Sequence, residues 1–524
     1  MSAKAWTLVA AILGSSIVFL DSTVVNVALP RIGQELPSSA FGVLEGQSYV
    51  YNGYLLTLSA LLILAGAVND FYGRRRVFAL GLAGFGVTSI LCGISPNMEL
   101  LVVSRVLQGA AGALLVPGSL ALITSTFEGG EQGRAFCVWA VASAGTTLLG
   151  PVIGGLLVDT VSWRAAFLIN VPVVALALWA TLRHVRESRD ENATGRFDWL
   201  GAFVVALAVG GLAFGAIYGE QRQWRDPVAF AALGVGALSA AALPFLMARR
   251  PDPLIPLALF RSRNFTVTNV STLLIYGALY VFGYFMALFT QGTLGYTAAA
   301  AGLAGLPISA ILAALSARVG ALAGRYGPRL FMTVGPAVMS LGVLWLARAP
   351  AGSTAWRLVP NDPASWFPPA SYFVDFFPAM IAFGAGLVVL VAPLTTALMR
   401  SVPVRNSGLA SAINNAISRI GPQLAGAAIF VLITGAFYAG LAQRLPGVDT
   451  SDPAFRLAVA PLNPPNSSEP AVQRASREQS AEAFHLAMLA SFGLLAAGAV
   501  VNAVGIQNDP TEPLPARSEA RVAA

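Results

Sequence analysis

Two side chains of opposite charge lie deep inside apolar segments of this chain. Asp21 falls near the middle of the apolar run 6–30, and Arg105 falls within the run 99–126. If such a run crosses a membrane, burying an acid at its centre costs about 2.5–3.5 kcal/mol, less when the acid is protonated or paired. Asp21 is therefore predicted to carry a coupling proton. The alternative is a structural acid, hydrogen-bonded to Ser22 or Thr23.

A helix through Arg105 would put Arg105, Gln108 and Gly112 on one face, because they recur at i, i+3 and i+7. The small residues Gly109 and Gly112 would let another helix approach closely. Arg105 is predicted to pair with Asp21 until a proton or a substrate displaces it. The alternative is a fixed structural ion pair.

The elements that must hold these residues are long apolar helices. The chain has 524 residues, of which 56% are hydrophobic and only 11% charged. A soluble protein of this length would need more charge to cover its surface, and about 20 apolar residues in a helix span a bilayer core. The predicted fold class is an all-α integral membrane protein. Fourteen helices are predicted, at 6–30, 47–69, 76–96, 99–126, 134–158, 164–183, 197–218, 227–248, 266–290, 298–323, 329–348, 372–399, 407–438 and 482–506.

The distribution of arginines predicts the orientation. With the N-terminus inside, most of the loop arginines fall on the inner side. This favours a multi-pass protein of the plasma (inner) membrane with both termini in the cytoplasm. The longer outside loops, 349–371 and 439–481, are rich in Pro, Asn and Ser, and a short helix is expected near 452–460. The tail 507–524 is predicted to be a disordered cytoplasmic segment.

Two short stretches occur twice. "GAVNDFYGRRR" (66–76) is echoed by "GALAGRYGPR" (320–329), and "LLGPVIGG" (148–155) by "RIGPQLAG" (419–426). Their order predicts two related six-helix bundles, as secondary transporters often have. The predicted domains are two bundles, 1–190 and 264–506, with an inserted helix pair at 197–248.

The first of these stretches combines a carboxylate with cations at the expected inner end of a helix. Gly66 precedes Asp70, Gly73 allows a tight turn, and Arg74, Arg75 and Arg76 follow. A partly buried ion pair that must break would serve as a latch, since breaking it exposes both charges. Plain anchoring at the membrane surface is the alternative.

A second group of residues would shape a helix rather than carry charge. Its members are small residues and one proline, Gly145, Gly150, Pro151, Gly154 and Gly155. Pro151 frees a backbone carbonyl and bends the helix, while the glycines permit close packing. Packing alone would also explain them.

Aromatic residues are predicted to form the walls of a substrate cavity. Tyr276, Tyr280 and Tyr284 repeat every four residues, and aromatic walls accept lipophilic molecules or cations. Packing or lipid contact is the alternative. The cavity is also predicted to include Tyr49, Tyr54, Asn26 and Gln108.

The sequence also argues against other classes of function. His184 and His485 are the two histidines, and no GxxxxGK[ST] phosphate loop occurs, so neither a metal, a cofactor nor ATP hydrolysis is expected. The scattered loop arginines favour membrane topology over nucleic-acid binding. Cys92 and Cys137 lie in apolar runs and are interpreted as small buried hydrophobes. An intramembrane enzyme would need clustered polar residues and remains a remote alternative.

Six stretches together resemble the 14-helix drug:proton antiporters of the major facilitator superfamily, over about residues 6–438. They are "LDSTVVNVALP" (20–30), "GAVNDFYGRRR" (66–76), "RVLQGAAGA" (105–113), "GTTLLGPVIGG" (145–155), "SWRAAFLINVP" (162–172) and "SGLASAINNAISRIGP" (407–422). The loop motif departs from the usual pattern at Val68, Asn69 and Phe71, where the family has Leu, Ala and Arg.

The resemblance implies a proton-coupled exporter of lipophilic or cationic small molecules that acts as a monomer among membrane lipids. It further implies that Asp70 and the arginine triplet brace the cytoplasmic gate, and that the bend at Pro151 seals the cavity against leak. The alternative within transport is export of a specific metabolite, lipid or siderophore. The predicted second bundle has no acid deep in a helix, which argues against dicationic substrates.

Overall fold

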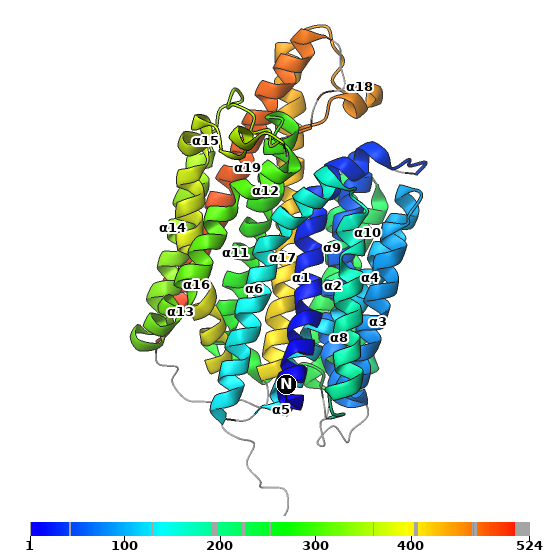
Figure 1. Cartoon of the computed structure of the whole chain (residues 1–524), viewed down its shortest axis with the longest axis vertical. Helices are drawn as coiled ribbons and strands as arrows, with labels where there is room; N and C mark the ends of the chain where they lie inside the picture. The colour runs from blue at the N-terminus through cyan, green and yellow to red at the C-terminus, as the bar shows by residue number, and fades with distance from the viewer. Residues whose placement is uncertain are drawn as a thin grey trace, which may run out of the picture.

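The structure of the chain is a computed structural model. It describes residues 2–40, 43–127, 129–189, 197–222, 226–250, 253–359, 361–402, 407–463, 465 and 469–508. Within these ranges every regular element is a helix. Figure 1 shows the long helices running alongside one another, with the N-terminus at the lower end and α18 (Pro453–Ala458) at the upper end.

The N-terminal group comprises eight helices that pack on one another: α1 (Ala3–Glu35), α2 (Val43–Tyr72), α3 (Arg74–Gly93), α4 (Met98–Ala113), α5 (Leu115–Thr126), α6 (Gly129–Thr160), α7 (Ala165–Leu168) and α8 (Asn170–His184). Helix α1 contacts α2, α5, α6 and α8, and so holds Asp21 at the centre of this group. Two further helices, α9 (Trp199–Gln221) and α10 (Pro227–Ala248), pack against each other.

The C-terminal group comprises the later elements: η1 (Leu257–Arg261), α11 (Arg263–Leu288), η2 (Phe289–Thr293), α12 (Ala298–Ala304), α13 (Leu306–Tyr326), α14 (Pro328–Leu346), η3 (Pro363–Trp366), α15 (Ala370–Asp375), α16 (Phe377–Arg400), α17 (Ser407–Arg444), α18 and α19 (Pro470–Gly505). Within it α11 packs on α17 and α19, and α14 packs on α16 and α19. Helix α9 touches both α2 and α17, so it lies against both groups. The division into two repeated bundles and an inserted pair stays a prediction.

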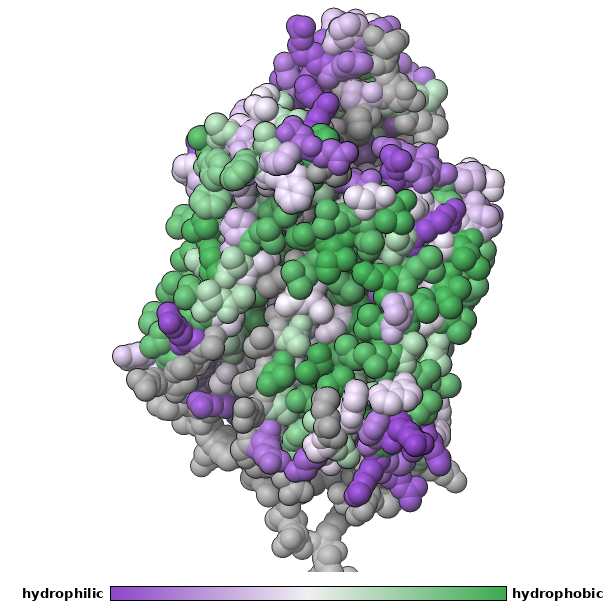
Figure 2. Space-filling view, in the orientation of Figure 1, coloured by the Kyte–Doolittle hydropathy of each residue, from purple (hydrophilic) through white to green (hydrophobic). Residues whose placement is uncertain are grey.

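The helices have the length and composition of membrane spans. Among the described residues, 13 helical segments are long and apolar enough to cross a bilayer. Helix α6 adds the shorter apolar stretch Gly145–Thr160, so the predicted count of 14 is approximately met. Figure 2 shows an apolar belt around the middle of the molecule, with hydrophilic residues gathered at both ends. The predicted all-α membrane fold is confirmed.

Two helices are longer than the sequence predicted. Helix α17 continues to Arg444 and α19 already begins at Pro470, so part of the predicted loop 439–481 is helical. Arg444 forms ion pairs with Glu478 and Glu482 of α19, and these pairs join the projecting helix ends seen at the top of Figure 1. A hydropathy pattern marks only the apolar part of a helix, so it cannot detect such polar extensions. The expected short helix near 452–460 is α18, whereas the tail 509–524 lies outside the described residues.

The repeated sequence stretches form similar local structures. Gly73 (φ 108°) lies between α2 and α3, and Gly327 (φ 82°) lies between α13 and α14, both in the region that favours glycine. The other pair of stretches also matches, since Gly150 of α6 packs on α1 and Gly421 of α17 packs on α11. These likenesses support the repeat, which stays a prediction.

The lower end is joined by a surface ion pair. Lys4 at the start of α1 donates a hydrogen bond of 2.7 Å to Glu131 in the first turn of α6. This bond holds the pKa of the Glu131 carboxyl below its usual range. Both side chains are exposed, so the pair orders the helix starts more than it stabilises the fold.

Candidate functional site

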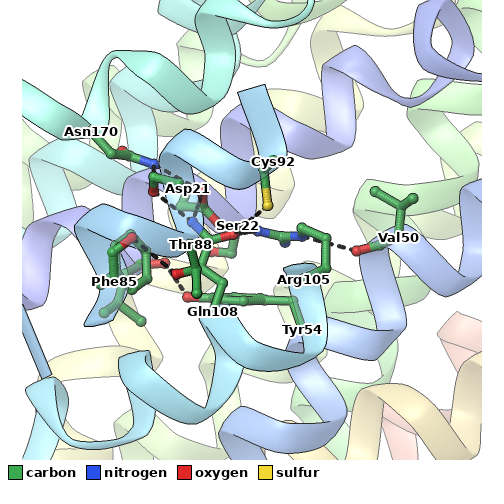
Figure 3. Close-up of polar contacts among 12 residues, drawn as sticks. Asp21, Ser22, Val50, Tyr54, Phe85, Thr88, Cys92, Arg105, Gln108 and Asn170 are labelled. Carbon is green, nitrogen blue, oxygen red and sulfur yellow. Dashed lines mark hydrogen bonds and ion pairs between the residues drawn. The ribbon is translucent and has the colours of Figure 1, made fainter. Parts of the chain in front are cut away.

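The centre of the N-terminal group holds a buried ion pair. Nη1 of Arg105 on α4 lies 2.5 Å from Oδ2 of Asp21 on α1, and neither side chain is exposed at all. Figure 3 shows the two side chains pointing toward each other from separate helices. Breaking such a pair leaves an uncompensated buried charge, which typically costs about 3–5 kcal/mol.

Two carboxamides complete the contacts of the carboxylate. Nε2 of Gln108 donates to Oδ1 of Asp21 at 3.1 Å, and Nδ2 of Asn170 donates to the same oxygen at 3.0 Å. Both amides also reach Oγ of Ser89 on α3, at 2.8 Å and 3.3 Å. Four helices thus contribute to one buried network, and protonating Asp21 removes the negative charge that strengthens its three hydrogen bonds.

The guanidinium of Arg105 is fixed on its other sides. Its Nε donates to the backbone carbonyl of Val50 at 3.0 Å, and its Nη1 also donates to Oε1 of Gln108 at 2.7 Å. The ring of Tyr54 lies beneath it, with 4.1 Å between Cζ and the ring centroid. Its Nη2 is buried without a hydrogen-bond partner. One donor of the network is therefore unused in this state.

The sequence explains why α4 can come so close to α2. A Cβ added at Gly109 would lie 2.3 Å from the backbone oxygen of Tyr54, so only glycine fits. This contact brings Arg105 within reach of the Val50 carbonyl. The predicted face of Arg105 and Gln108 does point to a single site, although Gln108 lies inside the Asp21 network rather than on a cavity wall.

Helix α6 is held between α1 and α12. A Cβ at Gly150 would meet Thr23 of α1 at 1.9 Å, and one at Gly154 would meet Val24. Gly155 faces the C-terminal group instead, since its Cβ would lie 2.8 Å from Cα of Ala299. The two groups therefore touch through backbone near the upper end of α6.

Neighbouring contacts extend this junction. A Cβ at Gly302 of α12 would lie 2.6 Å from the carbonyl oxygen of Pro151. Oδ2 of Asp159 accepts a hydrogen bond of 2.9 Å from the backbone N–H of Ala299. Gly145, in contrast, has no atom within 4 Å of an added Cβ. The five predicted residues of this helix thus have three kinds of neighbour. Gly150 and Gly154 face α1, Pro151 and Gly155 face α12, and Gly145 faces free space.

At the lower end the arginine triplet contacts its own group. Nε of Arg76 lies 3.6 Å from Oε2 of Glu187, just after α8, and the backbone N–H of Arg75 donates to Oε1 of Glu187 at 3.0 Å. Nη2 of Arg75 donates to the carbonyl of Leu182 at 2.6 Å. The side chain of Asp70 lies outside the described residues. The predicted brace from Asp70 to the other group stays a prediction.

Gly66 provides the contact between groups at this end. A Cβ there would lie 3.9 Å from Cβ of Ala412 on α17 and 3.7 Å from Pro117. The departures from the family motif also have partners: Nδ2 of Asn69 donates to the carbonyl of Leu114 at 3.2 Å, and Phe71 packs edge-on against Phe197. Asn69 therefore ties α2 to the α4–α5 junction.

The aromatic residues divide into two places. Tyr280 and Tyr284 of α11 stack on each other, with centroids 5.3 Å apart, and Tyr280 stacks on Tyr51 of α2 at 5.7 Å. The stack crosses from one group to the other. Tyr49 lies elsewhere, interacting electrostatically with Glu45 and Arg222.

The remaining residues assigned to a cavity also have definite settings. Tyr276 is partly buried on α11, one turn before Tyr280, and Asn26 is partly buried on α1. Tyr54 is fully buried, and its hydroxyl donates to the carbonyl of Val18 at 3.1 Å. A separate cavity of about 570 Å³ opens between the groups at the upper end. Arg31, Gln47, Asp159 and Gln291 are among its polar lining residues.

The described residues offer no obvious place for a metal ion, since no three His, Cys, Asp or Glu side chains among them gather suitably. Several contributors to the network and to the contacts at the lower end were not predicted. Ser89, Asn170 and Glu187 are polar residues whose roles depend on neighbours far away in the sequence. Asn170 lies within "SWRAAFLINVP", so the motif itself was a usable signal.

Comparison with known proteins agrees with this architecture. The family model described as "Major Facilitator Superfamily" matches residues 11–426. The chain belongs to the Major Facilitator Superfamily. It is a multi-pass membrane transporter by family, which agrees with its apolar helices and with the resemblance seen in its motifs.

Three curated relatives of the chain are named as resistance proteins. The chain is 36% identical over 417 residues to the multidrug resistance protein Stp of Mycobacterium tuberculosis, covering 79% of this chain and 73% of that protein. It is 34% identical over 447 residues to a puromycin resistance protein of Streptomyces alboniger, covering 84% of each. A tetracenomycin C resistance and export protein of Streptomyces glaucescens is 31% identical over 427 residues, covering 82% of this chain and 75% of that protein.

A solved structure shows the same superfamily fold. The inward-facing, unoccupied bacterial homologue of the human lysosomal transporter Spinster superposes with a TM-score of 0.63 at 16% identity. The match covers 96% of this chain and 97% of that one. At this identity the likeness concerns the fold alone.

Proposed function

We propose that the protein exports lipophilic small molecules, antibiotics among them, in exchange for protons. The observation that carries the proposal is the fully buried Asp21–Arg105 pair at the centre of a superfamily transporter. An ionisable residue in a membrane span is costly and so marks a functional site by default. Relatives named for multidrug resistance, puromycin resistance and tetracenomycin C export support the class of substrate.

Proton coupling follows from the hydrogen bonds that the Asp21 carboxylate accepts, because protonation weakens them. Asp21 accepts hydrogen bonds from Arg105, Gln108 and Asn170, which lie on α4 and α8, so adding a proton loosens α1 from both helices. Helix α1 also packs on α6, which holds the upper junction with α12. Protonation of one residue would thereby bias the contact between the two groups, as a two-state transporter requires.

The lower and upper junctions are the gates in this proposal. Gly66 against Ala412 and the Asp70 motif close the lower side, while Gly155 against Ala299 closes the upper side. In alternating access the two close in turn. The loop arginines make the lower end cytoplasmic by the positive-inside rule, which gives a plasma-membrane protein with both termini inside. We further propose that the transporter acts as a monomer.

Transport in proteoliposomes tests the function. Purified protein is reconstituted, a pH gradient is imposed, and movement is followed for a panel that includes puromycin, tetracenomycin C and ethidium. The proposal expects accumulation of at least one compound against its gradient, and collapse of that accumulation when a protonophore is added. Accumulation that persists after the protonophore is added, or the absence of transport for every compound of the panel, would overturn the proposal.

A further inference from the structure

One arginine of the C-terminal group lies between the two groups without a counter-ion. Arg419 on α17 is partly buried, and its Cζ lies 5.9 Å from the ring centroid of Phe19 on α1. It makes no hydrogen bond or ion pair with any residue in the described ranges. An arginine at membrane depth is costly unless something pairs with it. The side chain therefore needs a function beyond packing.

A second polar side chain stands one turn away on the same helix. Gln423 follows Arg419 at i+4, so the two are neighbours on one face of α17. Gln423 is only 2% exposed, yet neither its Nε2 nor its Oε1 has a hydrogen-bond partner. Leaving a buried amide unpaired costs about 1–3 kcal/mol. Two adjacent residues thus present unused donors at the same place.

Aromatic residues of both groups lie near the Arg419 guanidinium. Tyr51 and Tyr54 of α2 and Tyr276 of α11 interact electrostatically with the Arg419 guanidinium. Tyr51 continues into the stack with Tyr280, and a Cβ at Gly426 of α17 would lie 2.8 Å from that ring. A cation walled by aromatic rings from both groups can bind a flat molecule between the rings and hold its charged end.

We propose that Arg419 and Gln423 are the polar anchor of the substrate site, and that the site takes aromatic molecules bearing an anionic group such as a carboxylate or phenolate. This rests on the proposed function, which it deepens by reversing the charge expected from the sequence. The guanidinium pairs with the anion, the Gln423 amide donates to it, and the rings cover the aromatic body. Because Phe19, Tyr51 and Tyr54 belong to one group and Arg419 to the other, a bound anion bridges both.

The geometry favours an anion over a cation. Asp21, the acid nearest in the sequence to Phe19, already accepts three hydrogen bonds inside its own network and faces Arg105. The positive charge of Arg419 would repel a cation, whereas a carboxylate gains two charge-assisted hydrogen bonds from a guanidinium. Loss of the Arg419 guanidinium should weaken binding of the anion about tenfold or more, which is the usual effect of removing a hydrogen bond to a charged group.

Binding of a matched probe series tests the proposal. The probes are 1-pyrenebutyrate, 1-pyrenebutanol and pyrenebutyl-trimethylammonium, which share one ring system and differ in charge. Binding to the full-length protein in phosphatidylcholine nanodiscs is followed by energy transfer from tryptophan, with empty nanodiscs subtracted. The wild type should bind the butyrate about tenfold more tightly than the alcohol, and the cation most weakly.

Variants assign this preference to the anchor. Arg419→Gln should remove the preference for the butyrate over the alcohol, and Arg419→Lys should retain part of it. Arg348→Gln is the matched control, because Arg348 is exposed and stacks on Trp345 at the upper end. Thermal stability of each variant in the same nanodiscs shows that it is folded.

The outcomes separate this inference from the proposed function. Equal binding of the three probes by the wild type, or an unchanged preference in Arg419→Gln, overturns the anion site even if pH-driven ethidium transport is intact. Failure of pH-driven transport across the whole panel overturns the proposed function, while a preference that disappears in Arg419→Gln would still establish the anion site.

Discussion

Arg105 and Asp21 form a salt bridge of 2.5 Å in which both side chains are completely buried, and their other hydrogen-bond partners in the described ranges belong to the N-terminal group. The pair lies within the N-terminal group, where Asn170 and Gln108 share the same carboxylate. A proton bound at Asp21 therefore acts on the packing of α1, α4 and α8.

The contact from Asn170 predicts a change in pH dependence. Asn170→Ala removes one of the three hydrogen bonds to Asp21, so the carboxylate has less to lose on protonation. The pH dependence of transport should therefore differ from that of the wild type, because a bond that favours the charged carboxylate is missing. Initial transport rates measured from about pH 5 to about pH 9 would reveal this change.

Asn52→Ala is the control for this measurement. Asn52 is also a buried asparagine, but it donates to Ser48 on its own helix and does not touch the network. An equal shift in both variants would show that the effect of Asn170→Ala is general to helix packing. The assigned role of the Asp21 network would then be wrong.

The junction of α6 and α12 predicts a change in conformational equilibrium. Gly155→Ala places a methyl group 2.8 Å from Cα of Ala299, where backbone must move. Such overpacking typically costs about 1–3 kcal/mol, so the state with an open upper side should gain roughly tenfold or more in population. Spin labels at the upper ends of α6 and α12 would report the longer distance.

Gly145→Ala serves as the matched control, because nothing lies within 4 Å of the added methyl group on the same helix. It should leave the distance distribution as in the wild type. If Gly155→Ala also leaves it unchanged, the glycine face is a packing feature and the upper junction is not a gate.

The lower end carries a prediction made from the sequence. Asp70→Asn should abolish or strongly slow transport while leaving insertion and folding intact, because the amide keeps the shape of the carboxylate but cannot form an ion pair. Substrate transport in vesicles and the melting temperature of the purified variant are the two measurements. Near-normal transport would reduce the stretch 66–76 to an anchor at the membrane surface.

Particular residues show how far the sequence could be followed. Asp21 and Arg105 were found because a charge in an apolar run is conspicuous, and the structure places them together. Their partners Ser89 and Asn170 could not be found this way, since polar uncharged residues are common in membrane helices and only the fold decides which of them meet. The apolar spans were likewise visible, while the polar extensions of α17 and α19 depend on the pairing of Arg444 with Glu478 and Glu482.

Arg419 was present in a quoted motif but was not recognised as an intramembrane cation. Its significance lies in what it does not contact among the described residues, and a sequence gives no information on that. Tyr49 and Tyr54 show the same limit. They stand five positions apart on one helix, yet Tyr49 lies near Glu45 and Arg222 while the Tyr54 ring lies beneath Arg105. Helical spacing alone could not assign either ring to the cavity.

The central claim is that protonation of Asp21 drives exchange, and Asp21→Asn in proteoliposomes tests it most directly. The asparagine keeps the size and part of the hydrogen bonding of the carboxylate but cannot titrate. Asp449→Asn, in an exposed loop where Asp449 bonds Ser451, is the control. Accumulation of substrate against its gradient is measured with and without a pH gradient. The account predicts that Asp21→Asn loses pH-driven accumulation while still binding substrate, and that Asp449→Asn behaves as wild type. Retained pH-driven accumulation in Asp21→Asn would contradict it and move the coupling site to another acid, such as Asp159 at the upper junction.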